Sequence, residues 1–457
     1  MAAARVHWSS RLGFVLAAAG SAVGLGNLWK FPYVTWENHG GAFVIVYLVA
    51  VLVLGLPIMT AEILVGRRAQ LSPVPAFEKL GGKAWSVVGW LGVLTGAIIQ
   101  SYYMVIAGWS LRSFYQCMRW SISGYEQPGK EDFGNFLANG GLQVGLTALF
   151  TLTTALIVYR GVSGGIEQAT KIMMPVLCAI LLYLVASALM MPGRSQALSM
   201  MFTPRFSELP AAGILEAVGQ AFFSLSLGLG AMITYGSYIS QKESIFKAAG
   251  SVVLFDTAVA LLACLAMFTI IFSVPGLDKQ ISGSTVGMLF ITLPNLFYTS
   301  MPGGVVVAPL FFVLVAFAAL SSTISLGEVV VSLFIDKRGW SRGKSVVVCS
   351  SGVFVASVLA ALSLGAVGPL SSFEIFDGKE GVLTTLDHLA ANWCLPLGGL
   401  GTTTFVGWFL GRKQCLEELG VTQPTLLFTI WIWILRLVAP VAILAILIAV
   451  ALGKDFS

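Results

Sequence analysis

Several polar side chains stand inside apolar stretches that are long enough to cross a membrane. Asn27 follows the run AGSAVGLG, Asp256 stands in SVVLFDTAVALLACLAMF, and Ser321 and Ser322 stand in FAALSSTISLGE. A charge at mid-membrane depth costs at least about 2.5–3.5 kcal/mol, so such a group normally faces a polar cavity or the interior of a helix bundle. Carboxylate, amide and carbonyl oxygens are the ligands that hard cations prefer. These residue types could therefore bind a small cation such as Na⁺.

The glycines around this region weaken the helix that should carry Asn27. Gly20, Gly24 and Gly26 fall within seven positions, and each weakens a helix by about 1 kcal/mol relative to alanine. An unwound helix frees backbone amides and carbonyls, which membranes tolerate only toward protein or a polar cavity. The freed amides suit a carboxylate and the freed carbonyls suit a cation. We predict a site for an anionic group beside a cation; close packing through small residues is the alternative.

A similar pattern recurs in the second half of the chain. Residues 224–231 read SLSLGLGA, whereas residues 21–27 read SAVGLGN. Paired glycine-interrupted segments in two halves of a membrane protein point to a transporter's binding site. A further buried acid is Glu62, for which a binding role and a structural hydrogen bond are equally plausible.

The elements that must position these residues are membrane-spanning helices. The 457 residues are 57% hydrophobic and only 10% charged, whereas a soluble domain carries about 25% charged residues. Each span needs roughly 20 apolar residues, and continuous runs of this length favour helices over barrel strands. Eleven segments qualify: about 12–36, 41–66, 86–118, 141–160, 166–191, 213–238, 245–274, 305–335, 345–367, 384–410 and 425–452.

The positions of the basic residues predict an orientation. Most of the 26 Lys and Arg residues fall in loops on the side of the N-terminus, which predicts a cytoplasmic N-terminus and, after eleven spans, a C-terminus outside. The net charge of +5 then reflects topology, and we expect no nucleic-acid partner. The scattered cysteines and three distant histidines suggest no metal cluster. No nucleophile–base pair is evident, so we expect no enzyme.

Four motifs closely resemble the neurotransmitter:sodium symporter family, whose bacterial leucine transporter defines the LeuT fold. They are RVHWSSRLGFVLAAAGSAVGLGNLWKFPY, QAFFSLSLGLGAMITYGSY, GMLFITLPNLF and FAALSSTISLGE, in that order. The resemblance covers nearly the whole chain and is closest to bacterial members of the eleven-helix type. It implies an all-α polytopic membrane protein with a single transporter domain over 1–457. Helices 1–5 (about 12–191) and 6–10 (about 213–410) would form inverted repeats, with helices 1 and 6 unwound and an extra helix at about 425–452.

The resemblance also implies two sodium sites. The first would take oxygens from Ala22, Asn27, Ser224 and Asp256, together with the substrate carboxylate. The second would take oxygens from Gly20, Val23, Ala318, Ser321 and Ser322. Asp256 stands where chloride-dependent members have asparagine, so its fixed charge predicts that no chloride is needed.

A substrate pocket follows from the same resemblance. Its residues would be Ala22, Gly24, Leu25, Gly26, Ile99, Tyr103, Phe223, Ser224, Ser226, Leu229, Ser322 and Leu326. The amides of Leu25 and Gly26, with the Tyr103 hydroxyl, would hold the α-carboxylate, and nearby carbonyls would hold the amine. Gly24 stands where monoamine-carrying relatives have an acid. The pocket is otherwise apolar apart from hydroxyls, which predicts a neutral, hydrophobic amino acid.

Two gates would close this pocket. The inner network of the family is matched by Arg5, Trp8, Ser237, Tyr238 and Asp336, and Glu328 is expected in a network on the same side. The outer gate departs from the family pattern, because Lys30 replaces an arginine and Ala390 stands at the position of the partner acid. Asp387, about one turn away, is the candidate substitute, with Gln220 near Lys30.

Together these interpretations predict sodium-coupled uptake of neutral, hydrophobic amino acids by alternating access. The protein would lie in the lipid bilayer of the inner (plasma) membrane as a monomer or weak homodimer. The alternative is a sodium-dependent exchanger or sensor that binds amino acids without concentrating them. A channel is disfavoured by two gates around a dry pocket.

Overall fold

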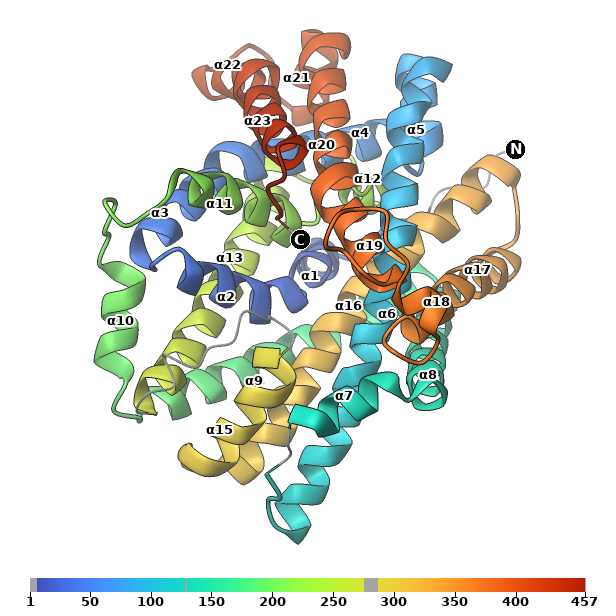
Figure 1. The fold of residues 1–457 in the computed structure, drawn as a ribbon. Coiled ribbons are helices and arrows are strands. Elements are labelled where there is room, and N and C mark those ends of the chain that lie inside the picture. Colours follow the sequence, from blue (N-terminus) through green and yellow to red (C-terminus); the bar gives the residue numbers. More distant parts are fainter. Residues whose placement is uncertain (1–5, 128–129, 275–286, 457) are drawn as a thin grey trace.

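The computed structural model describes residues 6–127, 130–274 and 287–456, and this part of the chain is helical without strands. Figure 1 shows α6 (Ser86–Ser123) and α16 (Gly304–Arg338) running through the molecule. These two long helices pack against each other along much of their length. The prediction of an all-helical membrane protein is confirmed in its helical character.

The first predicted span is broken as expected. Helix α1 (Arg11–Ala22) begins after Ser10, whose side chain accepts a hydrogen bond from the Gly13 amide. The backbone leaves the helix at residues 23 and 24 and resumes as η1 (Gly26–Lys30) and α2 (Phe31–Glu37). The two parts are bent by 54°. The glycines and the small side chains around residues 20–26 make this break inexpensive.

The second predicted break is longer. Helix α11 (Ala211–Ser224) ends before a non-helical stretch at residues 225–230, and α12 (Ala231–Gly236) follows it. Gly228 and Gly230 have φ of 80° and 77°, a left-handed conformation that glycine adopts readily. Ser226, at φ 53°, adopts it as well. Helices 1 and 6 are thus both unwound near the middle of their spans.

Among the described residues, eight helices are long and apolar enough to cross a membrane, or up to nine if the bent pair at 11–37 counts as one span. The predicted count of eleven stays a prediction, because the sixth and tenth predicted spans are divided into shorter helices. The eight long helices are Gly41–Ala69 (α3, η2 and α4), Lys83–Ser123 (η3 and α6), Gly140–Tyr159 (α8), Val162–Leu189 (η4 and α9), Ile245–Ser273 (α13), Gly304–Arg338 (α16), Arg342–Leu362 (α17) and Leu426–Ala451 (α22, η8 and α23).

Shorter helices complete the structure. They are α5 (Pro73–Gly81), α7 (Lys130–Ala138), α10 (Arg194–Phe202), η5 (Met288–Thr292), α15 (Leu293–Ser300), α18 (Gly368–Ser371), α19 (Val382–His388), η6 (Leu389–Cys394), α20 (Leu395–Thr404), η7 (Phe405–Phe409) and α21 (Arg412–Leu419). The tenth predicted span corresponds to α19 through η7, which follow one another without a gap.

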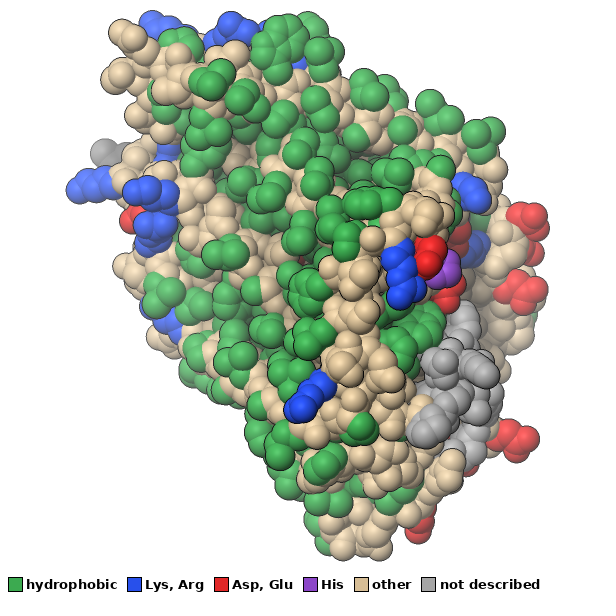
Figure 2. All heavy atoms as spheres, turned by 90° about the vertical axis from the view of Figure 1, so that its left-hand side faces the viewer, with side chains coloured by type: hydrophobic (Ala, Val, Ile, Leu, Met, Phe, Trp, Pro, Cys, Tyr) green, Lys and Arg blue, Asp and Glu red, His purple; other side chains and the backbone are tan. Residues whose placement is uncertain are grey.

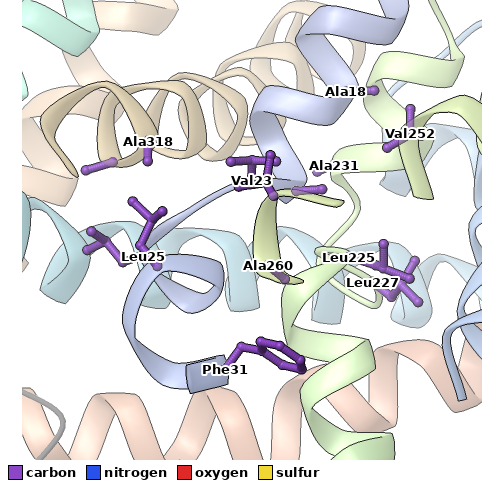
Figure 3. Packing of buried hydrophobic residues seen from close by; sticks show 14 of the residues in the cluster. Ala18, Val23, Leu25, Phe31, Leu225, Leu227, Ala231, Val252, Ala260 and Ala318 are labelled. Atoms are coloured by element: carbon purple, nitrogen blue, oxygen red, sulfur yellow. The ribbon is translucent and has the colours of Figure 1, made fainter. Parts of the chain in front are cut away.

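Apolar packing holds the two breaks together. Figure 3 shows Val23 and Leu25 of the first break and Leu225 and Leu227 of the second among buried neighbours from α13 and α16. Glycine allows a close approach between α4 (Leu56–Ala69) and α12. A Cβ on Gly66 would lie 1.9 Å from the Ile233 carbonyl oxygen, so these backbones pack directly against each other.

The surface fits a lipid environment. Figure 2 shows hydrophobic side chains spread over the middle of one face, with basic and acidic side chains mostly toward its edges. Large apolar side chains such as Leu52, Leu254 and Val347 are more than half exposed. Contact with lipid chains costs such a surface no free energy, whereas exposure of the same apolar side chains to water is unfavourable.

Candidate functional site

A small cavity lies where the two breaks meet α6 and α16. Its lining residues are Ser21, Ala22, Gly24, Gly26, Asn27, Ile99, Tyr103, Phe223, Ser224, Ser226, Leu229, Ser322, Ser325, Leu326 and Leu395. The structure therefore brings together all of the predicted substrate-binding residues except Leu25. Three lining residues were not foreseen, namely Ser21, Ser325 and Leu395.

Leu25 contributes to this site through its backbone. Its amide donates a hydrogen bond of 2.8 Å to the Tyr103 hydroxyl. A Cβ on Gly24 would lie 2.8 Å from this hydroxyl and 2.8 Å from Ser322 Oγ. Two hydroxyls and a freed amide thus converge at the first break, and only glycine leaves room between them. The arrangement offers hydrogen-bond donors to a small anionic group.

Hydroxyl groups join the two breaks on another side of the cavity. Ser226 Oγ donates to the Ser21 carbonyl oxygen at 2.9 Å, and Ser21 Oγ donates to Ser325 Oγ at 2.7 Å. The other lining side chains, such as Ile99 and Phe223, are apolar, and none of the described lining residues is Lys, Arg, His, Asp or Glu. The cavity therefore suits a ligand whose side chain is uncharged.

A buried carboxylate stands beside the cavity. Asp256 and Asn27 are both completely buried. Asn27 Nδ2 donates to Asp256 Oδ1 at 2.7 Å, and Ser224 Oγ donates to Asp256 Oδ2 at 2.7 Å. Elements η1, α11 and α13, which are far apart in the sequence, bring these three groups together. Sequence reasoning did not foresee Tyr47, whose hydroxyl donates to Ser224 Oγ at 3.4 Å.

Three residues of the second predicted cation set, Gly20, Ala318 and Ser321, lie close together near the end of α1. A Cβ on Gly20 would lie 3.1 Å from Ser321 Cβ on α16. In a continuous helix the Gly24 amide would donate to the Gly20 carbonyl, but here it donates to Asn27 Oδ1 at 3.1 Å. Carbonyl oxygens at a helix end are among the groups that need an outside partner. Ser321 Oγ donates to the Ala318 carbonyl oxygen at 3.0 Å, which holds that hydroxyl in the same region.

Glu62 supports the second break. Its Oε1 accepts a hydrogen bond of 2.7 Å from the Gly228 amide, which the break has freed. The side chain is completely buried, and its Oε2 has no hydrogen-bond partner among the described residues. Of the two roles considered for Glu62, this geometry supports the structural hydrogen bond.

A polar network between α12, α16 and α17 includes residues of the predicted inner gate. Trp8 Nε1 donates to the Tyr235 carbonyl oxygen at 3.1 Å, and the Tyr238 hydroxyl donates to Glu328 Oε1 at 2.7 Å. Arg342 pairs with both oxygens of Glu328. We call this the Arg342 end. Asp336 accepts a hydrogen bond from the Ser72 amide at 2.7 Å, and the predicted Arg5 lies outside the described residues.

A neighbouring contact on the same side was missed. The Ser9 amide donates to Glu167 Oε2 at 2.9 Å, and Lys171 Nζ lies 2.7 Å from Glu167 Oε1. Glu167 is completely buried at the start of α9. The spacing of Glu167 and Lys171 within an apolar span was the available signal, but nothing local pointed to Ser9.

The predicted outer gate, which we call the Lys30 end, has contacts that the sequence did not predict. Lys30 Nζ lies 4.7 Å from the centre of the Phe223 ring and donates to the Phe456 carbonyl oxygen at 2.7 Å. None of the ion pairs between described residues joins Lys30 to Asp387. Lys30 and Gln220 do line one hollow of about 640 Å³. Nothing in the sequence indicated that Phe456 contacts Lys30.

These features define a class of protein. Two interrupted spans that meet at a buried polar site are the architecture of a secondary transporter. A model of the Sodium:neurotransmitter symporter family matches residues 5–127 and 133–454. The chain therefore belongs to the Sodium:neurotransmitter symporter family.

Individual relatives agree with this assignment. An uncharacterized sodium-dependent transporter of Bacillus subtilis, YhdH, is 34% identical over 96% of both chains. An uncharacterized sodium-dependent transporter of Methanocaldococcus jannaschii, MJ1319, is 35% identical over 97% of this chain and 89% of its own. The crystal structure of MhsT in complex with L-phenylalanine has a TM-score of 0.87 and 40% identity, covering 97% of this chain and 99% of that one.

The likeness to MhsT confirms the predicted LeuT fold. As a member of this family the chain is a multi-pass membrane transporter that uses sodium. Its relatives are transporters, which confirms the prediction that it is not an enzyme. The positions of the binding and gating residues remain predictions.

Proposed function

We propose that this protein takes up neutral, hydrophobic amino acids together with sodium by alternating access, without a need for chloride. One observation carries the proposal. The cavity has hydrogen-bond donors for a carboxylate at one end, an apolar lining elsewhere and a buried carboxylate at its side. The L-phenylalanine in complex with MhsT is such an amino acid.

The substrate carboxylate would meet the Tyr103 hydroxyl and the amides of Leu25 and Gly26. The amine would meet carbonyl oxygens of Ala22 and of the second break, near Phe223 and Ser226. Ile99, Leu229 and Leu326 would surround the side chain. A Lys or Glu side chain would have no partner here, and burying an unpaired charge is strongly unfavourable.

Two sodium ions would bind beside the substrate. The first would lie among Ala22, Asn27, Ser224 and Asp256. The Asn27 nitrogen faces Asp256, so half a turn about the terminal bond of this amide would present its oxygen to a cation in that place. The second ion would lie among Gly20, Val23, Ala318, Ser321 and Ser322.

A shared contact would couple the ion to the substrate. If the substrate carboxylate completes the shell of the first sodium, each ligand tightens the binding of the other by the same factor. Asp256 would supply the negative charge that chloride supplies elsewhere in the family. The Lys30 end would face the outside of the inner (plasma) membrane and the Arg342 end the cytoplasm. The protein would act as a monomer or weak homodimer.

A binding panel tests this proposal. Purified protein is incubated with labelled leucine, phenylalanine, tyrosine, lysine or glutamate in Na⁺ and in K⁺. We expect leucine, phenylalanine or tyrosine to bind in Na⁺ only, and lysine and glutamate not to bind. Equal binding in both salts, or preferred binding of lysine or glutamate, would overturn the proposed site.

Chloride is tested separately by replacing it with gluconate. We expect unchanged binding of phenylalanine by the wild type, because Asp256 provides a fixed charge. Asp256→Asn should weaken sodium-dependent binding in gluconate by about tenfold or more, as expected for the loss of one charged partner. A wild type that binds only in chloride would contradict the role of Asp256.

A further inference from the structure

The segment that follows α23 crosses the Lys30 end of the cavity. Helix α23 (Ala439–Ala451) ends at Leu452, and Gly453 turns the chain with φ 89°. In Figure 1 the chain beyond α23 turns back toward the middle of the molecule. We call residues 453–456 the strap.

Phe456 fixes the end of the strap through its backbone and its ring. Its carbonyl oxygen accepts from Lys30 Nζ at 2.7 Å, and its amide donates to Asn392 Oδ1 at 2.8 Å. Phe456 lines an apolar recess together with Phe223 and Leu395. Both of these residues also line the central cavity, so the strap lies directly behind the wall of the candidate binding site.

Asp455 fastens the strap to the opposite wall. Its carboxylate pairs with Lys379, accepts from Asn392 Nδ2 at 2.7 Å and lies 3.3 Å from His388 Nδ1. Lys30 belongs to η1, whereas His388 and Asn392 belong to α19 and η6. The strap therefore bridges the broken first span and the tenth predicted span. A secondary transporter opens its site by moving such elements apart.

We propose that the strap is the missing half of the outer gate. The position expected to hold an acid is occupied by buried Ala390. The strap supplies an acceptor for Lys30 instead, the Phe456 carbonyl oxygen, while Asp455 anchors the strap to Lys379 and Asn392. While the site is closed, the strap keeps Lys30 over Phe223. Each time the site opens to the outside, residues 453–456 move away from this position. This inference rests on the proposed alternating access.

A disulfide tests whether the strap must move. A Cβ on Gly219 would lie 3.9 Å from Phe456 Cβ, which is within the Cβ–Cβ range of disulfides. The double variant Gly219→Cys, Phe456→Cys is reconstituted into vesicles, oxidised, and checked by mass spectrometry for complete linkage. Uptake of labelled phenylalanine in Na⁺ should fall by about tenfold or more and return on reduction. Each single variant should be unaffected by the oxidant.

Two results would overturn the proposal. One is undiminished uptake by fully linked protein, because the strap then does not need to move. The other is failure of the disulfide to form under oxidation. Wild-type uptake tests the proposed function separately. If the wild type does not accumulate phenylalanine, the proposed transport function is wrong. If linkage nevertheless slows phenylalanine binding by about tenfold, the strap still controls access to the site.

A charge reversal tests whether the contacts of Asp455 hold the strap in place. In Asp455→Lys the new lysine side chain faces Lys379, and the two like charges repel each other. The strap should then be held less firmly, so bound phenylalanine should dissociate about threefold to tenfold faster. The double variant Asp455→Lys, Lys379→Asp restores an opposite pair and should return the rate toward wild type. A purely structural defect would not be rescued in this way. An unchanged dissociation rate in Asp455→Lys would contradict the positioning role.

Discussion

The two regions predicted to gate the cavity are held together by different kinds of contact. At the Arg342 end, a guanidinium pairs with both oxygens of buried Glu328, and Tyr238 joins the same carboxylate. At the Lys30 end, an ammonium meets a backbone carbonyl and an aromatic face. The Arg342 end therefore depends on an ion pair between side chains, whereas the Lys30 end depends on the position of the strap.

This difference has an energetic consequence. Breaking a buried ion pair leaves an uncompensated charge, which is far more costly than the loss of a part-exposed hydrogen bond. Arg342 also offers a planar fork that fits a carboxylate, whereas Lys30 is a point charge that accepts many geometries. We expect point substitutions to damage the Arg342 end strongly and the Lys30 end mildly. The following changes, in order of decreasing expected effect, test this contrast.

The largest effect should follow Arg342→Met. Glu328 is completely buried, and removing its partner should destabilise the protein by about 3–5 kcal/mol. The thermal unfolding midpoint of the purified protein measures this loss. The matched control combines Arg342→Met with Glu328→Gln and should recover much of the stability, because no buried charge is left. A single variant as stable as wild type would show that this ion pair does not hold the Arg342 end.

A substitution in the cavity, between the two ends, should weaken the binding of phenylalanine. In Gly24→Ala the new Cβ would lie 2.8 Å from two hydroxyl oxygens. Overpacking of this kind costs about 1–3 kcal/mol, so phenylalanine should bind about 10- to 100-fold more weakly in equilibrium binding. Gly250→Ala on α13 is the matched control, since its Cβ would meet open space. If both variants bind like wild type, the cavity around Gly24 is not the binding site.

At the Lys30 end, Lys30→Met should have a smaller effect. This substitution keeps an apolar stem of similar length and removes the ammonium. Dissociation of labelled phenylalanine should become about threefold to tenfold faster, because one charge-assisted hydrogen bond at a part-exposed position is lost. A rate equal to that of wild type would show that Lys30 does not help to close this end.

The smallest effect is expected for Asp387→Ala. None of the ion pairs between described residues joins Asp387 to Lys30, so the dissociation rate should change by less than about twofold. A change as large as that of Lys30→Met would identify Asp387 as the partner of Lys30. Both ends would then be built from side-chain charges, and the contrast between them would disappear.

Much of the fold could be predicted because its signals are local. The predicted spans 41–66 and 245–274 correspond to Gly41–Ala69 and Ile245–Ser273. The glycine-rich runs indicated both breaks, since glycine weakens helices and adopts positive φ wherever it stands. The convergence of Asn27, Ser224 and Asp256 was expected only from the family resemblance, because spacing alone cannot align three distant helices.

The rest could not be predicted because it depends on long-range contacts. Lys30 and Phe456 lie 426 positions apart, and nothing in the sequence around Phe456 indicates that these two residues are in contact. The same holds for Ser9 and Glu167, which lie 158 positions apart. The missing acid at Ala390 was visible from the family resemblance, but nothing in the sequence indicated that residues 453–456 lie next to Lys30.

Sodium-coupled transport is tested most directly by uptake into sealed vesicles that contain the purified protein. An inward sodium gradient is imposed, and the internal concentration of labelled L-phenylalanine is followed over time. We expect accumulation above the external concentration with Na⁺ outside and none with K⁺. Equilibration without accumulation, at equal rates in both salts, would contradict sodium-coupled symport and favour an exchanger or sensor.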